Sequence, residues 1–266
     1  MDFTHYALIA GFVILLISNF YLLNRYLKYK ARYQVANSTF ASPMRRVSLA
    51  EIDPVFTPNE FGVTLDTQVQ YIGKGNLPVV GATSDTEAWV LAVLAKKAKK
   101  MFEFGTCTGK TTYLWALNSP DDAQIDTITL SPEQIEQYSK ENVKDSNEMT
   151  ETAKAESQFT RFLYSDTPVA YKVNQIFNDS KLLDENAYQG QMDLIFIDGS
   201  HAYSYVMSDS EKALKMVAPN GIILWHDYRG TREAPDVYHA LNKLAEKIEL
   251  VQISGTSLVA YINRKK

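Results

Sequence analysis

Aspartate and histidine side chains follow two apolar runs in the C-terminal half of the chain. Asp198 and His201 come after the run DLIFI, and the pair His226-Asp227 comes directly after IILW. Two carboxylates that converge at neighbouring strand ends suit a hard divalent cation such as Mg²⁺, which prefers oxygen ligands. A histidine with a pKa of about 6.5 is suited to accept a proton at neutral pH. The imidazole of His226 is softer and therefore a poorer ligand for Mg²⁺.

A Gly-rich stretch, EFGTCTGKTT over residues 103–112, raises the question of phosphate binding because it ends in Gly-Lys-Thr-Thr. A nucleotide-triphosphate loop would need its first glycine at the position that holds Phe104. The dinucleotide fingerprint would need glycines where Cys107 and Lys110 stand. Both interpretations are therefore disfavoured. What remains is an acidic residue and a Gly-rich turn, Glu-x-Gly-Thr-x-x-Gly, directly after an apolar strand.

The elements that must position these residues alternate between helix and strand from residue 84 onward. The first helix, over 84–98, opens with a capping box of Ser84 and Glu87. Strands are predicted over 100–105, 125–130, 171–179, 192–199, 222–228, 249–254 and 257–263. Further helices are predicted over 110–119, 131–143, 204–218 and 235–248. Residues 144–158 are polar, and we expect them to form an exposed insertion. The alternation predicts an α/β fold with a doubly wound, mostly parallel seven-stranded sheet and a site at the carboxyl ends of its strands.

The Gly-rich turn and the two acidic strand ends together resemble the class I S-adenosylmethionine (SAM)-dependent methyltransferases. The residues that match their first motif are Glu103, Gly105, Thr106 and Gly109. Residues 193–228 resemble the subset that includes macrocin O-methyltransferase and the cephalosporin hydroxylase-like enzymes, through I-D-G-x-H and H-D at successive strand ends. The resemblance extends over residues 60–266 and implies a Rossmann-like domain with SAM as its cofactor.

The resemblance also implies which residues bind the cofactor. They are Glu103, Gly105, Thr106, Gly109, Thr129, Ser131, Asp179 and Asp198. Small residues let the backbone approach the methionine part of SAM, Glu103 can meet its ammonium group, and Asp179 lies beside the adenine. The acid that usually binds the ribose hydroxyls after the second strand is missing from TITLSPEQ. Thr129 or Ser131 stands there, and a neutral hydroxyl offers a weaker hydrogen bond.

The same resemblance assigns roles to the two acidic strand ends. Asp198 and Asp227 are implied ligands of a metal such as Mg²⁺, which holds the hydroxyls of the acceptor. Asp198 and His201 are the implied catalytic residues, with His201 as the general base that removes the hydroxyl proton. Other interpretations stay open: Asp198 contacting SAM without a metal, His201 capping the next helix, and His226 forming structural hydrogen bonds.

The first thirty or so residues differ from the rest of the chain. The run from Tyr6 to Leu23 carries no charge, and as a helix it would span ~27 Å, close to the hydrocarbon core of a bilayer. No lysine or arginine precedes this run, and four basic residues follow it: Arg25, Lys28, Lys30 and Arg32. The positive-inside rule predicts a single-pass membrane anchor with the C-terminal domain facing the cytoplasm. A signal peptide or a buried core helix is the alternative.

Composition adds a few limits on function. The formal net charge of −4 gives no reason to expect nucleic-acid binding, and the single cysteine excludes an internal disulfide. We expect an anchor over 1–33, a linker over 34–59 and a methyltransferase domain over 60–266. The expected function is O-methylation of a sugar, lipid-linked or other small-molecule hydroxyl. Assembly of the chain into a homo-oligomer stays open. A non-catalytic, membrane-tethered scaffold or small-molecule-binding module of the same fold is the alternative.

Overall fold

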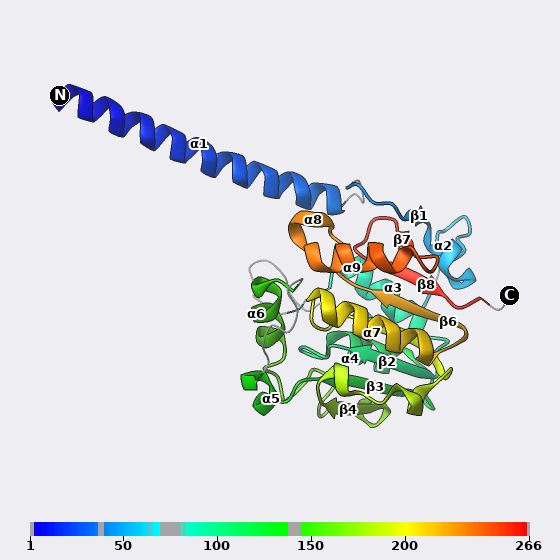
Figure 1. Ribbon diagram of the computed structural model, residues 1–266. Coiled ribbons are helices and arrows are strands. Elements are labelled where there is room, and N and C mark those ends of the chain that lie inside the picture. The colour runs from blue at the N-terminus through cyan, green and yellow to red at the C-terminus, as the bar shows by residue number, and fades with distance from the viewer. Residues whose placement is uncertain are drawn as a thin grey trace.

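A sheet of eight strands runs through the centre of the protein, with helices packed on both of its faces (Figure 1). The computed structural model describes residues 3–36, 40–63, 65–69, 81, 83–137 and 145–264. The strand order across the sheet is β1-β7-β8-β6-β5-β2-β3-β4. The strands are Arg45–Val47 (β1), Lys100–Phe104 (β2), Gln124–Thr129 (β3), Val173–Phe177 (β4), Met192–Ile197 (β5), Val217–Trp225 (β6), Val251–Ile253 (β7) and Val259–Ile262 (β8).

The pairing of the strands is mostly parallel. Strands β2 to β6 share one direction, whereas β8 is antiparallel to both β6 and β7. The chain order reverses beside β2, because β3 and β4 lie on one side of this strand and β5 and β6 on the other. In open α/β sheets, ligands bind at such a switch point, outside the carboxyl ends of the strands. The predicted doubly wound architecture is therefore confirmed.

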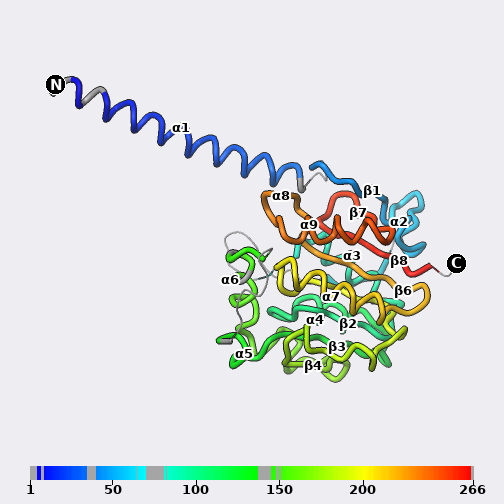
Figure 2. The backbone as a smooth tube through the Cα atoms, in the orientation of Figure 1, coloured from blue at the N-terminus to red at the C-terminus, as the bar shows by residue number. Residues whose placement is uncertain are grey.

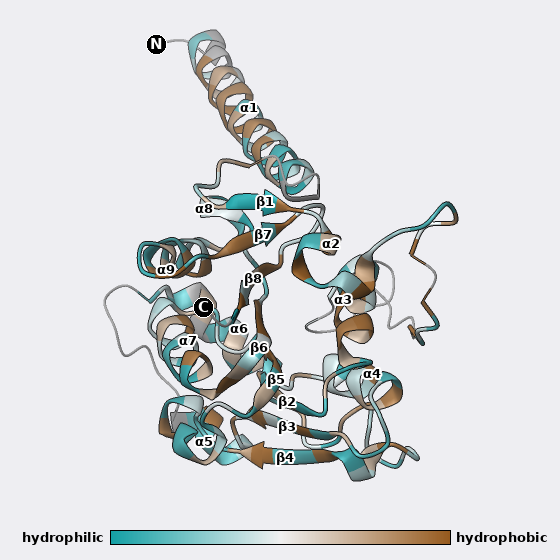
Figure 3. Cartoon of the chain, turned by 90° about the vertical axis from the view of Figure 1, so that its right-hand side faces the viewer, coloured by the Kyte–Doolittle hydropathy of each residue, from teal (hydrophilic) through white to brown (hydrophobic). Residues whose placement is uncertain are grey.

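Helices cover both faces of the sheet, as Figure 3 shows, with α7 and α9 on one face and α3 and α4 on the other. The α-helices are Phe3–Ala36 (α1), Leu49–Ile52 (α2), Asp85–Ala95 (α3), Lys110–Asn118 (α4), Pro132–Gln137 (α5), Asn147–Glu156 (α6), Tyr203–Met216 (α7), Gly230–Glu233 (α8) and Pro235–Ala245 (α9). Short 3₁₀ turns span Pro54–Phe56 (η1), Ala170–Lys172 (η2), Ser180–Leu182 (η3) and Glu185–Tyr188 (η4). Leu194, Ile195 and Phe196 of β5 are all buried, as expected of a parallel strand covered on both faces.

Residues 45–56, which we expected to lie in a linker, belong to the folded domain. Strand β1 pairs in parallel with β7, with Arg45 opposite Val251, so the sheet has eight strands rather than the predicted seven. Val47, Ile52 and Phe56 are buried in the core cluster that includes α3. These apolar residues are separated by proline and charged residues, so neither a helical nor a strand period marks the segment in the sequence.

Helix α1 leaves the domain as one helix of 34 residues (Figure 2). Its segment Ile9–Gln34 is long and apolar enough to cross a membrane, and it overlaps most of the predicted span over 6–23. Large apolar side chains such as Phe20 are exposed along it. The C-terminal end of α1 contacts α8, where Arg32 Nε lies 3.9 Å from Glu233 Oε2. These properties fit a membrane span or a signal sequence.

Residues 144–158, which we expected to form an exposed insertion, include the helix α6, which packs on the domain. Met149 and Ala153 are buried against Ala202 and Tyr205. Residues four positions apart share one face of a helix, so both apolar side chains of α6 face the start of α7. The helix predicted over 131–143 begins as α5, and its residues after Gln137 lie outside the described part of the chain, as does Lys144.

Candidate functional site

The two acidic strand ends meet because their strands are neighbours in the sheet. Ile197, at the end of β5, is paired with Trp225, at the end of β6, so Asp198 and His226 follow at the same edge. The backbone N–H of His226 donates to the carbonyl of Ile197 at 3.1 Å. Asp227 then adopts a φ of +59°, a conformation that is uncommon for a residue other than glycine and that is frequent at functional sites.

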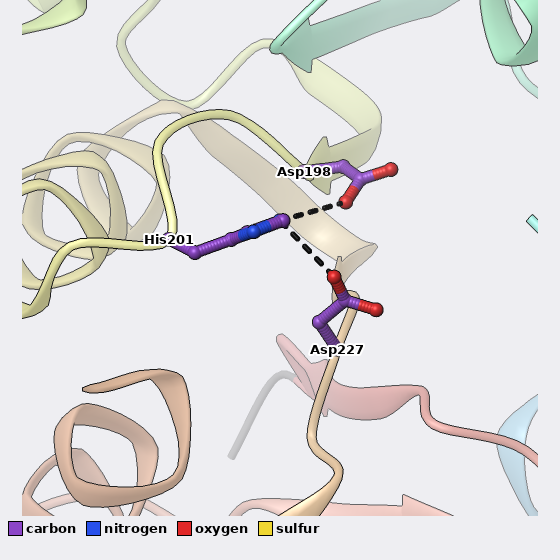
Figure 4. Close-up of side chains that lie close together, drawn as sticks. All are labelled: Asp198, His201 and Asp227. Carbon is purple, nitrogen blue, oxygen red and sulfur yellow. Dashed lines mark ion pairs between the residues drawn. The ribbon is translucent and has the colours of Figure 1, made fainter. Parts of the chain in front are cut away.

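Asp198, His201 and Asp227 point toward one another at this edge (Figure 4). The Nε2 atom of His201 lies 3.1 Å from Asp227 Oδ2 and 3.7 Å from Asp198 Oδ1. One ligand atom from each residue lies within 4.8 Å of the other two. His201 Nε2 and Asp227 Oδ1 are buried, and charged groups of the cluster lie within ion-pair distance of both atoms. Carboxylate oxygens and an imidazole nitrogen gathered in this way are ligand types that divalent cations take.

Glu87 belongs to the same cluster although it lies far away in the sequence, near the start of α3. Its Oε2 lies 3.3 Å from Nε2 of His226. The Nδ1 atom of the same ring lies 3.0 Å from Oδ1 of both Asp198 and Asp227. Glu87 Oε1 accepts hydrogen bonds from the backbone N–H and the hydroxyl of Ser257, each at 2.7 Å. The sequence identified Glu87 only as a capping-box residue, a role that it also has, and no sequence signal linked Glu87 to His226.

Charges within this cluster shift one another strongly. Burial alone would raise the pKa of Asp198, but His226 and His201 lower it to about 2. Burial would lower the pKa of His201, yet the carboxylates, Asp227 foremost, raise it to about 9. The pKa of His226 is likewise raised well above its ordinary value, against burial, by Asp198 and Asp227. Arg229 adds a further positive charge, with Nη2 2.6 Å from Asp227 Oδ1. The carboxylates of this cluster are thus paired with positively charged side chains of the chain itself.

The Gly-rich turn after β2 brings its backbone against the end of β5. Gly105 has a φ of +97°, and a Cβ atom there would overlap the carbonyl oxygen of Asp198. Gly109 has a φ of +79°, and a Cβ atom there would lie 2.9 Å from Cβ of Phe162. Both positions require glycine for their backbone conformation and for space. At Gly109 the close neighbours are aromatic side chains of the domain itself.

Glu103 lies beneath this turn and is enclosed by threonine hydroxyls. Its carboxylate accepts hydrogen bonds from Thr112 and, at 2.7 Å, from Thr127, whose hydroxyl is also 2.7 Å from that of Thr106. Burial raises the pKa of Glu103 to about 8 although these hydrogen bonds oppose the shift. The structure therefore places Glu103 and Thr106 in the packing below the turn, whereas the sequence predicted direct contacts with the cofactor.

A pocket opens at the carboxyl ends of β2 to β5. Of the predicted cofactor-binding residues, those that line it are Gly105, Thr129 and Asp198. Lining residues that the sequence did not single out for the cofactor include Leu130, Glu156, Asn178, Ser180, Tyr205 and Asp209. They come from the ends of β3 and β4 and from α6 and α7, and no motif marks them as a set. Helix packing brings them to the pocket.

Ser131 and Asp179, two further predicted contacts, act as caps beside this pocket. The hydroxyl of Ser131 accepts from the backbone N–H of Gln134 at 3.3 Å, at the start of α5. Asp179 accepts from the backbone N–H of Lys181 at 2.9 Å and from the hydroxyl of Tyr205 at 2.8 Å. Neither residue is among those that line the pocket. Structural hydrogen bonds thus occupy the side chains that we expected to contact the ribose and the adenine.

A second pocket adjoins the first and contains the charged cluster. It is lined by Gly81, Cys107, Glu156, Asp198, His201, His226, Asp227 and Arg229. Cys107, Glu156 and Asp198 line both pockets. Burial raises the pKa of the Cys107 thiol to about 12 and that of Glu156 to about 7, so Cys107 stays a neutral thiol at neutral pH. The two pockets therefore meet at Asp198.

Comparison with known proteins identifies the central part of the chain. Residues 102–228 match the family model described as a methyltransferase domain. One relative, an uncharacterized protein of Acanthamoeba polyphaga mimivirus, is 38% identical over 58 residues, which make up 22% of this chain. The chain matches only about a quarter of the length of that relative, 26%.

Comparison with solved structures finds similar chains at low sequence identity. The methyltransferase PaMTH1 of Podospora anserina, determined with S-adenosylhomocysteine (SAH) bound, is 18% identical, with a TM-score of 0.50 over 70% of this chain and 81% of that chain. The O-methyltransferase TomG of Streptomyces achromogenes, involved in tomaymycin synthesis and determined with SAM, is 17% identical, with a TM-score of 0.48 over 70% of this chain and 83% of that chain. The likeness to PaMTH1 concerns the fold and agrees with the match of the family model.

Proposed function

We propose that this chain, whose residues 102–228 match a methyltransferase domain, is a class I SAM-dependent enzyme that methylates a hydroxyl oxygen of a small-molecule, sugar or lipid-linked acceptor with the help of a divalent cation. The observation that carries this proposal is the meeting of the two pockets at Asp198. A methyl donor in the first pocket and an acceptor in the second would face each other there. Direct transfer needs this proximity, with reacting atoms ~3–3.5 Å apart.

The chemistry of the second pocket supports transfer to oxygen. Asp198 and Asp227 would hold the cation, with Nδ1 of His226, which faces both carboxylates, as a nitrogen ligand. When bound, the cation would polarise the acceptor hydroxyl and offset the carboxylate charge that favours protonated His201. In its neutral form, His201 can accept the hydroxyl proton at Nε2, the ring atom that faces Asp198 and Asp227. Because two imidazoles lie beside the carboxylates, Mn²⁺ or Zn²⁺ suits the set as well as Mg²⁺ does.

The proposed setting of the enzyme is a membrane surface. Exposed apolar side chains along α1 and the basic residues that follow its apolar run support a single-pass anchor with the domain on the cytoplasmic side. An enzyme held there meets lipid-linked acceptors readily. Protease protection in sealed vesicles checks this orientation: we expect cleavage of the domain only when its side of the membrane is exposed, and a chain released from membranes by alkaline carbonate would contradict an anchor.

Ligand binding and methyl transfer by the full-length protein in detergent test the proposal. SAH is titrated in a calorimeter with and without Mg²⁺ or Mn²⁺, and tritiated methyl transfer from SAM to sugar and lipid acceptors is then measured. We expect binding, and we expect Asp198→Ala and His201→Ala to lose methyl transfer while circular dichroism stays unchanged. Asp122→Ala, which removes an exposed carboxylate, is the matched control. Full activity in both site variants would refute the proposed site.

A non-catalytic, membrane-tethered binding module is the second candidate. It is favoured by Thr129, which stands where the family has an acid that binds the ribose. Against it stands the gathering of Asp198, His201 and Asp227, which a scaffold does not need. SAH binding without methyl transfer to any acceptor would favour the binding module. Methyl transfer from SAM that depends on an added acceptor would exclude the module.

A further inference from the structure

An acid that the proposed mechanism does not use lies deep in the cofactor pocket. Asp209, in the middle of α7, is 1% exposed and lines this pocket. Its side chain is hydrogen-bonded to that of Ser180, but its Oδ1 is buried without a partner among the described residues. Leaving such an acceptor unsatisfied costs free energy, so the geometry calls for a hydrogen-bond donor supplied by a ligand.

The order of the strands indicates which part of SAM comes near Asp209. The reacting methyl group must lie where the two pockets meet, at Asp198 after β5. Away from this point along the sheet edge come Gly105 after β2, Thr129 at the end of β3 and Asn178 after β4. The nucleoside half of the cofactor therefore extends toward Asn178, and its base lies furthest from Asp198.

At this end of the pocket, the neighbouring acid is already engaged. Both carboxylate oxygens of Asp179 accept hydrogen bonds, from the backbone N–H of Lys181 and from the hydroxyl of Tyr205. We infer that Asp209 accepts a hydrogen bond from the 6-amino group of adenine and thereby selects this base. The inference rests on the proposed use of SAM and assigns the recognition of its base to a residue outside the sequence motifs.

Physical chemistry of the carboxyl group supports this assignment. Burial raises the pKa of Asp209 to about 7, and the hydrogen bond with Ser180 opposes the shift only in part. A donor aimed at Oδ1 would stabilise the ionised form. The 6-oxo group of hypoxanthine would instead place an acceptor opposite an acceptor, and a buried site built for one hydrogen-bond pattern rejects its inverse.

The test compares SAH with S-inosylhomocysteine, which carries hypoxanthine in place of adenine. Both are titrated into the full-length protein at a pH well above the pKa of Asp209. We expect the unsubstituted protein to prefer SAH by at least about tenfold. Asp209→Asn should bind SAH about tenfold more weakly and reduce or reverse the preference, because the amide can donate to the 6-oxo group. Asp236→Asn, at a buried acid outside this pocket, should keep the original ratio.

Each outcome separates this assignment from the broader proposal. SAH binding with an unchanged ratio in Asp209→Asn overturns the role of Asp209 alone. If the preference for SAH over S-inosylhomocysteine is lost in Asp179→Asn and kept in Asp209→Asn, adenine is recognised by Asp179, as the sequence suggested. Failure of the unsubstituted protein to bind SAH overturns the proposed function and this inference together. Should Asp209→Asn fail to fold, the ratio in the unsubstituted protein still decides, because equal affinity for both bases contradicts a selecting acid.

Discussion

The Nε2 atom of His226 lies 3.3 Å from Oε2 of Glu87, on the side of the ring opposite the two aspartates. This contact fixes the orientation of an imidazole whose Nδ1 faces Asp198 and Asp227. Metal-binding histidines are commonly oriented by a carboxylate behind the ring. Glu87 is held in turn by Ser257 from the β7–β8 turn. The proposed cation site therefore includes, behind His226, a residue of α3 that no site motif contains.

Substitution of Glu87 by Gln tests this dependence. Gln can still serve in the capping box of α3, but it removes the negative charge behind His226. We expect Mn²⁺ binding to weaken by about 10- to 100-fold, measured by calorimetry on the full-length protein. The control is Glu51→Gln, at an exposed residue of α2. Equal Mn²⁺ affinity in both variants would show that His226 takes no part in binding the cation.

Two glycine substitutions separate backbone strain from steric overlap. Gly190 has a φ of +65° with no atom within 4 Å of a built Cβ, whereas a Cβ at Gly105 would overlap the carbonyl of Asp198. Gly190→Ala should cost ~1–2 kcal/mol of unfolding free energy from the left-handed conformation alone. Gly105→Ala should cost about 3 kcal/mol or more, because overpacking adds to the strain, and it should also lose SAH binding. The free energies of unfolding are measured by chemical denaturation. Equal losses of stability in the two variants would contradict the close approach of Gly105 to the carbonyl of Asp198.

Restoring the missing acid tests where the ribose lies. Thr129→Asp places a carboxylate at the end of β3, inside the cofactor pocket. We expect SAH to bind about 5- to 10-fold more tightly, because hydrogen bonds to a charged acceptor are stronger. Without ligand, the buried charge should lower the melting temperature. Thr57→Asp, at an exposed residue, should change neither quantity, and weaker SAH binding by Thr129→Asp would place the ribose elsewhere.

The buried carboxyl of Glu103 predicts a pH dependence of stability. Burial raises its pKa from an ordinary value near 4.5 to about 8. Between these values the folded state binds more protons than the unfolded state, so the free energy of unfolding falls as pH rises through this window. The slope reaches at most ~1.4 kcal/mol per pH unit for one proton. Glu103→Gln should flatten the curve in denaturation experiments between these two pH values. If the difference in free energy of unfolding between the unsubstituted protein and Glu103→Gln did not change with pH in this window, the raised pKa of Glu103 would be contradicted.

Several features of the protein follow from local sequence patterns. The apolar run over 194–197 predicts a buried parallel strand, because a strand covered by helices on both faces of a sheet is apolar throughout. The left-handed conformation of Gly105 is equally local, since a tight turn after a strand favours glycine, whereas the overlap of a Cβ atom with the carbonyl of Asp198 depends on the neighbouring strand. The order of helices and strands then places Asp198 and Asp227 at one edge of the sheet. Architecture and the charged cluster were accordingly predictable, as was an apolar N-terminal helix.

Tertiary structure decided which side chains reach the pocket. Glu103 and Asp209 are both acids in predicted elements, yet packing encloses the first among threonines and leaves an oxygen of the second unpaired in the cofactor pocket. Glu87 reaches His226 only because α3 packs against the ends of β6 and β8. The sequence by itself determined the elements and their order, because hydrophobic period and turn chemistry act over a few residues. The contacts between distant side chains came from register and helix packing, which depend on the whole folded chain at once.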